Sequence, residues 1–311
     1  MRRVLYSARV ENSFKGEDDQ IMMDTAPSRE EPGKRTGNTT LIVLAILGLV
    51  LLIIGIFFPV TLEPVEISAK AVTTVAGVPI TNSMITGWIT LIVLAVVFGL
   101  GTRTMQLIPT GLQNLVEWII EALVGLAENV AGREKGREFF ALFATIFLYV
   151  LANNWIELLP GFTNATIYVQ HGEERIPLFR APSADLNFTL ALALTAVFMV
   201  QFWSIKHTGW GGWIRKFINL REGLIGFFVG LLETVSEVSR VISFSFRLFG
   251  NLFAGDVLLS VIPSLVPWVV VLPFMGLEIF VGVVQALIFA LLTLAFITMA
   301  TIPHGGSEHA H

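Results

Sequence analysis

Residues 243–256 read SFSFRLFGNLFAGD, and they place a single arginine, Arg247, inside a long apolar run. The whole chain of 311 residues is 54% hydrophobic and only 14% charged, and its mean hydropathy is +0.74. Soluble domains carry more charge and less apolar surface than this, so the composition indicates a membrane protein. A charged side chain at mid-membrane costs about 2.5–3.5 kcal/mol on insertion scales, and Arg247 therefore needs a specific reason to be there.

Six apolar runs are long enough to cross a hydrocarbon core of about 30 Å. They lie at about 41–60, 85–103, 138–158, 186–206, 222–262 and 265–301. The last two exceed the ~20 residues that a crossing needs, so their helices must tilt strongly or extend past the bilayer. We predict an all-α integral membrane protein with about six membrane-crossing helices, of which the last two are long, tilted and form a hairpin.

The segment 109–131, PTGLQNLVEWIIEALVGLAENVA, lies between the second and third runs and has the period of an amphipathic helix. Pro109 suits its first turn. This pattern predicts one interfacial helix. Its apolar stripe would contain Leu112, Leu115, Val116, Ile119, Leu123 and Val124, and its polar side Gln113, Asn114, Glu117 and Glu121.

Residues 1–38 are polar and unpatterned, with seven basic and seven acidic residues, which predicts a disordered tail. Transit peptides are poor in acidic residues, so this tail favours a bacterial origin. The run 41–60 is interpreted as an uncleaved membrane anchor, and a cleaved signal peptide is the alternative interpretation. The chain would then divide into a tail (1–38), an extra anchor with its outer loop (39–82), a membrane domain (83–303) and a C-terminal tail (304–311).

The basic residues outside the apolar spans set the orientation of the chain. Fifteen fall on the side of the N-terminal tail and three, Lys70, Arg175 and Arg180, on the other side. Cytoplasmic loops carry the excess of Lys and Arg, so both termini are expected in the cytoplasm of a cell that inserts this chain into its plasma membrane.

The long run at 222–262 contains a polar seam, which we define as Glu233, Glu237, Arg240, Arg247 and Asn251 on one helical face. Glu237 and Arg240 are three residues apart and are expected to form a structural ion pair. Arg247 has no acid three or four residues away in either direction. Its partner must therefore come from outside its own helix.

The outer end of the predicted hairpin carries two carboxylates at similar depth, Asp256 and, in the returning helix, Glu278. Gln285 is seven residues beyond Glu278 and would lie near the depth of Arg247. Two carboxylates above an unpaired arginine predict a proton path from the outside to mid-membrane. Polar residues at the outer ends of the neighbouring spans could join this path or simply be solvated; they are Asn153, Asn154, Glu157, Asp185 and Asn187.

Other kinds of chemistry have little support in the sequence. There is no cysteine, so no thiolate metal site or disulfide is expected. No G-x-x-x-x-G-K-[ST] phosphate loop occurs. The histidines His304, His309 and His311 could bind a metal, but a solvated tail is the favoured interpretation. We expect no cofactor, no bound metal and no nucleic-acid partner.

The stretch SRVISFSFRLFGNLFAGD (239–256) resembles a motif of subunit a of the F-type rotary ATP synthase. Further segments resemble this family in the same order: PTGLQNLVEWIIE (109–121), NNWIELLPG (153–161), PSADLNFTLALAL (182–194) and QALIFALLTLAF (285–296). The resemblance covers about 83–303 and leaves the tail and the first span as additions. Val241 and Phe296 stand where many members of the family have proline and tyrosine.

The resemblance implies a non-catalytic stator subunit that presents two offset half-channels to a rotating ring of c subunits and couples proton flow to ATP synthesis. The implied partners are the c-ring, the b subunits of the peripheral stalk and the remaining synthase subunits. Carried over by position, Arg247 would be the gate that faces a c-ring carboxylate, and Gln285 would face Arg247. The outer path would contain Asn251, Asp256, Glu278, Asn154, Glu157 and Asp185, and the inner path Glu233 and Ser236.

The alternatives to this function are a proton-coupled secondary transporter and a membrane scaffold. A proton-coupled secondary transporter would be expected to contain paired inverted repeats, and none is evident. A purely structural membrane scaffold would leave Arg247, Asp256 and Glu278 without a role.

Overall fold

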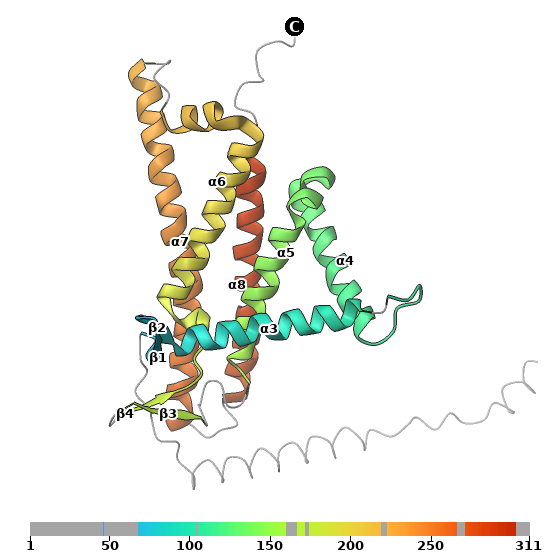
Figure 1. Ribbon diagram of the computed structural model, residues 1–311, viewed down its shortest axis with the longest axis vertical. Coiled ribbons are helices and arrows are strands. Elements are labelled where there is room, and N and C mark those ends of the chain that lie inside the picture. The colour runs from blue at the N-terminus through green and yellow to red at the C-terminus, as the bar shows by residue number, and fades with distance from the viewer. Residues whose placement is uncertain are drawn as a thin grey trace, which may run out of the picture. The chain divides into compact units, whose positions relative to one another are not determined.

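The computed structural model describes residues 46, 68–103, 105–159, 167–171, 174–218, 223–265 and 271–302 (Figure 1). The predicted tails at 1–38 and 304–311 and, apart from Ile46, the predicted span at 41–60 lie outside the described residues. The chain divides into two units, Met1–Ile53 and Ile54–His311, and every element below belongs to the second unit.

Six α-helices make up most of the described chain, which confirms the all-α prediction. They are α3 (Asn82–Thr102), α4 (Leu112–Ala131), α5 (Arg133–Ile156), α6 (Leu186–Phe217), α7 (Gly223–Leu265) and α8 (Val271–Ala300), with a short 3₁₀ turn, η1 (Pro182–Ala184), before α6. In the described part, α3, α5, α6 and α8 are each long and apolar enough to cross a membrane; α7, which carries the polar seam, is not among these four.

Helices α5, α6, α7 and α8 run side by side, and α3 runs across their direction (Figure 1). Helices that point in two such directions cannot all follow the membrane normal. Helices α5, α6, α7 and α8 share one apolar core. Its fully buried large side chains are Phe139, Phe143, Val150, Leu248, Leu252, Leu294 and Ile297.

Two short antiparallel hairpins, which the sequence reasoning did not predict, lie in the connections before α3 and between α5 and α6. One pairs β1 (Ala71–Val75) with β2 (Val78–Thr81), and the other pairs β3 (Tyr168–His171) with β4 (Glu174–Pro177). The first hairpin turns through Ala76 and Gly77, both with positive φ (52° and 83°), as a two-residue hairpin turn requires. The amide of Asn82 donates to the carbonyl of Pro177 (3.2 Å) and so connects the two hairpins.

The amphipathic helix α4 exists, but it starts at Leu112 rather than at Pro109. Gly111, with a φ of 58°, turns the chain immediately before the helix. The prediction that Gln113 belongs to the solvent side was wrong, because Gln113 is 8% exposed. Its amide is held by both backbone groups of Gln106, at 3.1 and 3.0 Å. The buried face of α4 also contains Val116, Leu123 and Ala127, whereas Leu112 and Leu115 of the predicted stripe are exposed.

Helix α6 bends sharply at Gly209, whose φ of 72° and ψ of 165° lie outside the helical range. The kink divides the predicted crossing from a short helix at 210–217, which we call the post-kink segment. Trp213 Nε1 of this segment donates to Gln201 Oε1 of the crossing (2.8 Å). The segment also comes close to α7, because a Cβ atom at Gly230 would overlap the carbonyl oxygen of Phe217. The bend of α6 is thus fixed at two points.

Gly136 holds α5 tightly against α4, and its substitution tests this packing. A Cβ there would lie 2.7 Å from the carbonyl oxygen of Ala127, a backbone atom that cannot rotate away. Gly136→Ala is expected to destabilise the protein by about 1–3 kcal/mol, as overpacking does, and thermal unfolding in detergent measures this. Gly125→Ala on α4 is the control, since no atom lies within 4 Å of its added Cβ. Equal melting temperatures for the two variants would contradict the close approach.

Candidate functional site

Arg247 lies on the outer surface of α7, away from the core. Its neighbours Phe244 and Leu248 are 4% and 1% exposed, whereas Arg247 itself is exposed. In the described part of the chain its guanidinium contacts no carboxylate and donates to Ser243 Oγ at 3.4 Å. The prediction that Arg247 lacks a partner within its own helix therefore holds within those residues.

The surface of α7 around Arg247 consists of small side chains. Ser239, Ser243, Gly250 and Ala254 are all exposed, and nothing lies within 4 Å of a Cβ placed on Gly250. Small residues in a membrane helix allow another helix to approach its backbone closely. An external helix could therefore bring a side chain within reach of the Arg247 guanidinium. Asn251, the last residue of the polar seam, is also exposed on α7.

Gln285 of α8 lies near the level of Arg247 but belongs to the interior. The rings of Phe244 and Phe289 are 5.0 Å apart and set the register between α7 and α8. Because the helices are antiparallel, moving about one turn outward from this contact leads to Arg247 on one helix and Gln285 on the other. Gln285 is only 8% exposed. The two residues thus share a depth while facing different surroundings.

Three carboxyl groups gather at the end of the helices that carries the two β-hairpins (Figure 1), and we call them the outer cluster after the side that the sequence predicts for this end. Glu157 follows the last residue of α5 and is 3% exposed, and Glu278 of α8 is 6% exposed. Asp256 of α7 is half-buried, and its neighbour Gly255 lies so close to the Glu278 carboxylate that any Cβ would overlap it. Burial raises the pKa of the Glu157 carboxyl well above its ordinary value. The Asp256 and Glu278 carboxyls raise that pKa further, whereas Arg180 lowers it.

Arg180 is a member of this outer cluster that the sequence reasoning used only to count charges. Its guanidinium donates to the carbonyls of Ser68 (3.1 Å) and Ala184 (3.2 Å), and its charge acts on Glu157. It precedes the buried turn η1 by two residues. The sequence signal for the role of Arg180 is its position next to the PSAD stretch (182–185), but the sequence does not indicate which way its side chain points.

Two buried hydrogen-bonded pairs, Asn154 with Ser183 and Asp185 with Ser83, form a group that we call the hub. Ser183 Oγ donates to Asn154 Oδ1 (2.6 Å), and Asn154 Nδ2 donates to the carbonyl of Gly282 (3.0 Å). Ser83 Oγ donates to Asp185 Oδ2 (2.6 Å), and Asp185 Oδ1 caps the start of α6. The sequence left open whether the polar residues at these helix ends are simply solvated. Asn153, Asn154, Glu157 and Asp185 are buried rather than solvated, whereas Asn187 is exposed.

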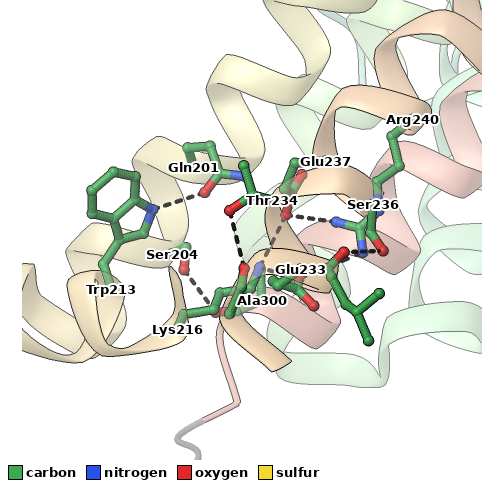
Figure 2. Close-up of polar contacts among 12 residues, drawn as sticks. Gln201, Ser204, Trp213, Lys216, Glu233, Thr234, Ser236, Glu237, Arg240 and Ala300 are labelled. Carbon is green, nitrogen blue, oxygen red and sulfur yellow. Dashed lines mark hydrogen bonds and ion pairs between the residues drawn. The ribbon is translucent and has the colours of Figure 1, made fainter. Parts of the chain in front are cut away.

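Four charged side chains form a second cluster at the other end of α7, which we call the inner network (Figure 2). Glu237 Oε1 accepts from Arg240 at 2.7 Å, which confirms the predicted i,i+3 pair. Lys216 of the post-kink segment also reaches Glu237 (3.0 Å) and Glu233 (2.9 Å). The Arg240 guanidinium lies 4.3 Å from the centre of the Phe296 ring, a cation–π contact that adds to its hold.

Ser236 lies on the exposed side of α7, beside the inner network (Figure 2). Its hydroxyl donates to the carbonyl of Leu232 at 2.9 Å. Lys216 was missed by the sequence reasoning, which counted it only as a cytoplasmic charge. The glycines of GWGGW (209–213) signal a turn there, but they do not reveal where the chain goes afterwards.

No group of three or more potential metal ligands occurs among the residues that the structure describes. The clusters are instead built from carboxylates, amides and fixed cations. The carboxylates among them can accept, hold and release protons, provided that water reaches them.

Comparison with known proteins matches residues 84–298 to the model of the family described as "ATP synthase A chain". The chain is 36% identical over 229 residues to ATP synthase subunit a of Helicobacter pylori strain Shi470, covering 72% of this chain and 93% of that protein. It is likewise 36% identical over 229 residues to the same subunit of Helicobacter acinonychis, with the same shares covered. For Moorella thermoacetica the identity is 32% over 228 residues, covering 73% and 93%.

Removing the Asp185 carboxylate tests the structural part of the site. Asp185→Ala removes the cap of α6 and leaves the buried Ser83 hydroxyl with Thr81 Oγ1 (3.0 Å) in place of the carboxylate, so a loss of about 1–2 kcal/mol in the free energy of unfolding is expected. Asn187→Ala is the control, because Asn187 is exposed and offers Asp185 only its backbone N–H. Thermal unfolding in detergent measures both variants. A melting temperature of Asp185→Ala equal to that of the control would contradict the capping role.

Proposed function

The chain belongs to the ATP synthase A chain family and is the stator proton-channel subunit of a rotary ATP synthase, and we propose that its two half-channels meet at Arg247. It is a multi-pass membrane protein and part of a multi-subunit ATP synthase complex. Arg247 supports the proposal because it is exposed on a face of small side chains and contacts no carboxylate within the described residues.

Arg247 acts as a gate in this proposal. A guanidinium stays protonated at any physiological pH and cannot relay protons itself. Beside a carboxylate of a c subunit it favours the ionised form and makes that charge tolerable in lipid. A proton that tried to pass straight from one half-channel to the other would meet this fixed positive charge. Protons are therefore carried around on the ring. Gln285 is assigned to the same depth as Arg247, in the interior of the helix bundle.

The outer half-channel is assigned to the three carboxyl groups and their amide neighbours. Asp256 belongs to α7 and Glu278 to α8, and these two helices approach each other closely where Gly255 lies against the Glu278 carboxylate. Glu157 joins them from α5, and the elevation of its pKa means that it can hold a proton under conditions where a solvated glutamate would have lost it. The hub residues Asn154 and Asp185 would line the mouth of this path, and Asn251 would lie between it and Arg247.

The inner half-channel is assigned to Glu233 and Ser236 at the other end of α7. Glu233 is the more exposed of the two acids of the inner network, at 30% against 10% for Glu237. It can therefore exchange protons with water while Glu237 stays anchored. Each proton that moves down a potential of ~100 mV supplies about 2.3 kcal/mol, so several protons are needed for each ATP.

The remaining assignments concern the surroundings of the chain. The proposed partners are the c-subunit ring, the b subunits of the peripheral stalk and the other synthase subunits. The membrane is proposed to be a bacterial plasma membrane, with both termini in the cytoplasm because the basic residues divide fifteen to three across it. The proposed membrane domain is 83–303, preceded by the tail at 1–38 and the anchor at 39–82 and followed by the tail at 304–311.

Replacement of Arg247 tests the gate. Arg247→Ala in the whole synthase, measured as ATP-driven acidification of inverted vesicles, is expected to reduce the proton signal to that of vesicles without ATP, because the ring carboxylate loses the charge that lets it pass ionised. Arg103→Ala is the control, since Arg103 is also exposed but lies at the end of α3. Normal acidification with Arg247→Ala would refute the gate.

A further inference from the structure

The inner network contains one cation from α6, Lys216, which has no assigned role in the proton path and is unusually buried for a lysine. Its side chain is only 15% exposed, although a lysine at a helix end would normally extend into water. Its Nζ instead lies 2.9 Å from Glu233 Oε1 and 3.0 Å from Glu237 Oε1 (Figure 2). A lysine that gives up this much hydration must be held there by specific contacts.

The position of Lys216 is set by the chain around it. The kink at Gly209 turns the chain across the end of the helices toward α7 (Figure 1), the bond from Trp213 to Gln201 fixes the post-kink segment, and Gly230 allows the end of that segment to rest against α7. Glu237 then anchors the ammonium group. Its Oε1 accepts from both Lys216 and Arg240, at 3.0 and 2.7 Å.

The second oxygen of Glu237 supports this anchoring role. Oε2 is buried and has no hydrogen-bond partner within the described residues. An unsatisfied buried carboxylate oxygen is unfavourable, so the attraction of the two cations to Oε1 must outweigh it. Glu237 therefore keeps one orientation and holds Lys216 in place.

Glu233 has a much weaker hold of its own. Its carboxylate is 30% exposed, and apart from Lys216 its nearest cation is Arg240, at 3.9 Å. That distance is too long for a hydrogen bond and leaves only the electrostatic attraction. Without Lys216, the Glu233 side chain would be free to take other rotamers toward water.

We propose that Lys216 is a positioning residue that holds the Glu233 carboxylate in the inner half-channel, with Glu237 as its anchor. This inference rests on the proposed function, in which Glu233 exchanges the protons released toward the inside. The post-kink segment of α6 then forms part of the inner half-channel, because it supplies the group that keeps the exchanging carboxylate in place.

The test uses the complete synthase reconstituted in vesicles and the initial rate of ATP-driven proton pumping. Lys216→Met is expected to reduce this rate by about tenfold or more, because misplacing a reacting group can cost up to about 10²-fold. Lys216→Arg keeps the charge and the reach, so it is expected to restore most of the rate. Arg215→Met is the matched control: it removes the same charge from the same turn, but Arg215 is exposed and outside the network.

Double variants separate a positioning role from a general structural one. If Lys216 acts through Glu233, then Lys216→Met adds nothing to Glu233→Gln, whereas independent effects would multiply. A reduced rate for Glu233→Gln together with a normal rate for Lys216→Met would overturn the inference and leave the inner path standing. A normal rate for Glu233→Gln would refute the inner path itself. An equal loss in Arg215→Met would also overturn the inference, since it would indicate a general effect of charge.

Glu237→Gln keeps the test decisive if Lys216→Met does not assemble. It keeps the shape of the side chain and weakens the anchor of Lys216, so a smaller reduction of the pumping rate is expected. The amount of subunit in the purified complex is measured for every variant, and rates are expressed per assembled complex. A normal rate in assembled Glu237→Gln would overturn the anchoring role and with it the inference.

Discussion

A permanent positive charge on an apolar helix is the constraint on which the rest of this molecule depends. Arg247 cannot lose its proton, and its own chain, as far as the structure describes it, offers it a serine hydroxyl rather than a carboxylate. Such a charge is tolerable only beside water or an anion. The small side chains around it leave space for a helix of another subunit, so the missing anion can be supplied from outside.

The two charged clusters differ in a way that suits opposite ends of one path. The outer cluster combines three carboxyl groups with one arginine and is packed by glycine, so its carboxylates lie close together, and burial raises the pKa of Glu157. The inner network combines two carboxylates with two cations and is balanced in charge. One end is thus suited to retain protons and the other to keep an ionised acceptor in place. Neither a secondary transporter nor a scaffold would require this asymmetry around a single arginine.

Much of the fold could be predicted because membrane helices are determined by local sequence. Long apolar runs indicated the helices α3, α5, α6, α7 and α8, and the i,i+3 spacing predicted the pair of Glu237 and Arg240. The start of α4 and the burial of Gln113 were predicted wrongly, because a glycine with positive φ and a contact to Gln106 decide them. The roles of Lys216 and Arg180 could not be predicted, since both depend on how the chain folds back across long sequence separations.

The most direct test of the central claim asks whether the face of Arg247 meets the membrane carboxylate of a neighbouring c subunit. The chain contains no cysteine, so single cysteines can be introduced cleanly. Ser243→Cys lies on the face of Arg247, whereas Ile242→Cys is also exposed but points elsewhere around the helix. With a second cysteine beside the c-subunit carboxylate, oxidation is expected to cross-link the two subunits through position 243 and not through position 242. Absence of a cross-link from position 243, or an equal yield from position 242, would contradict the account.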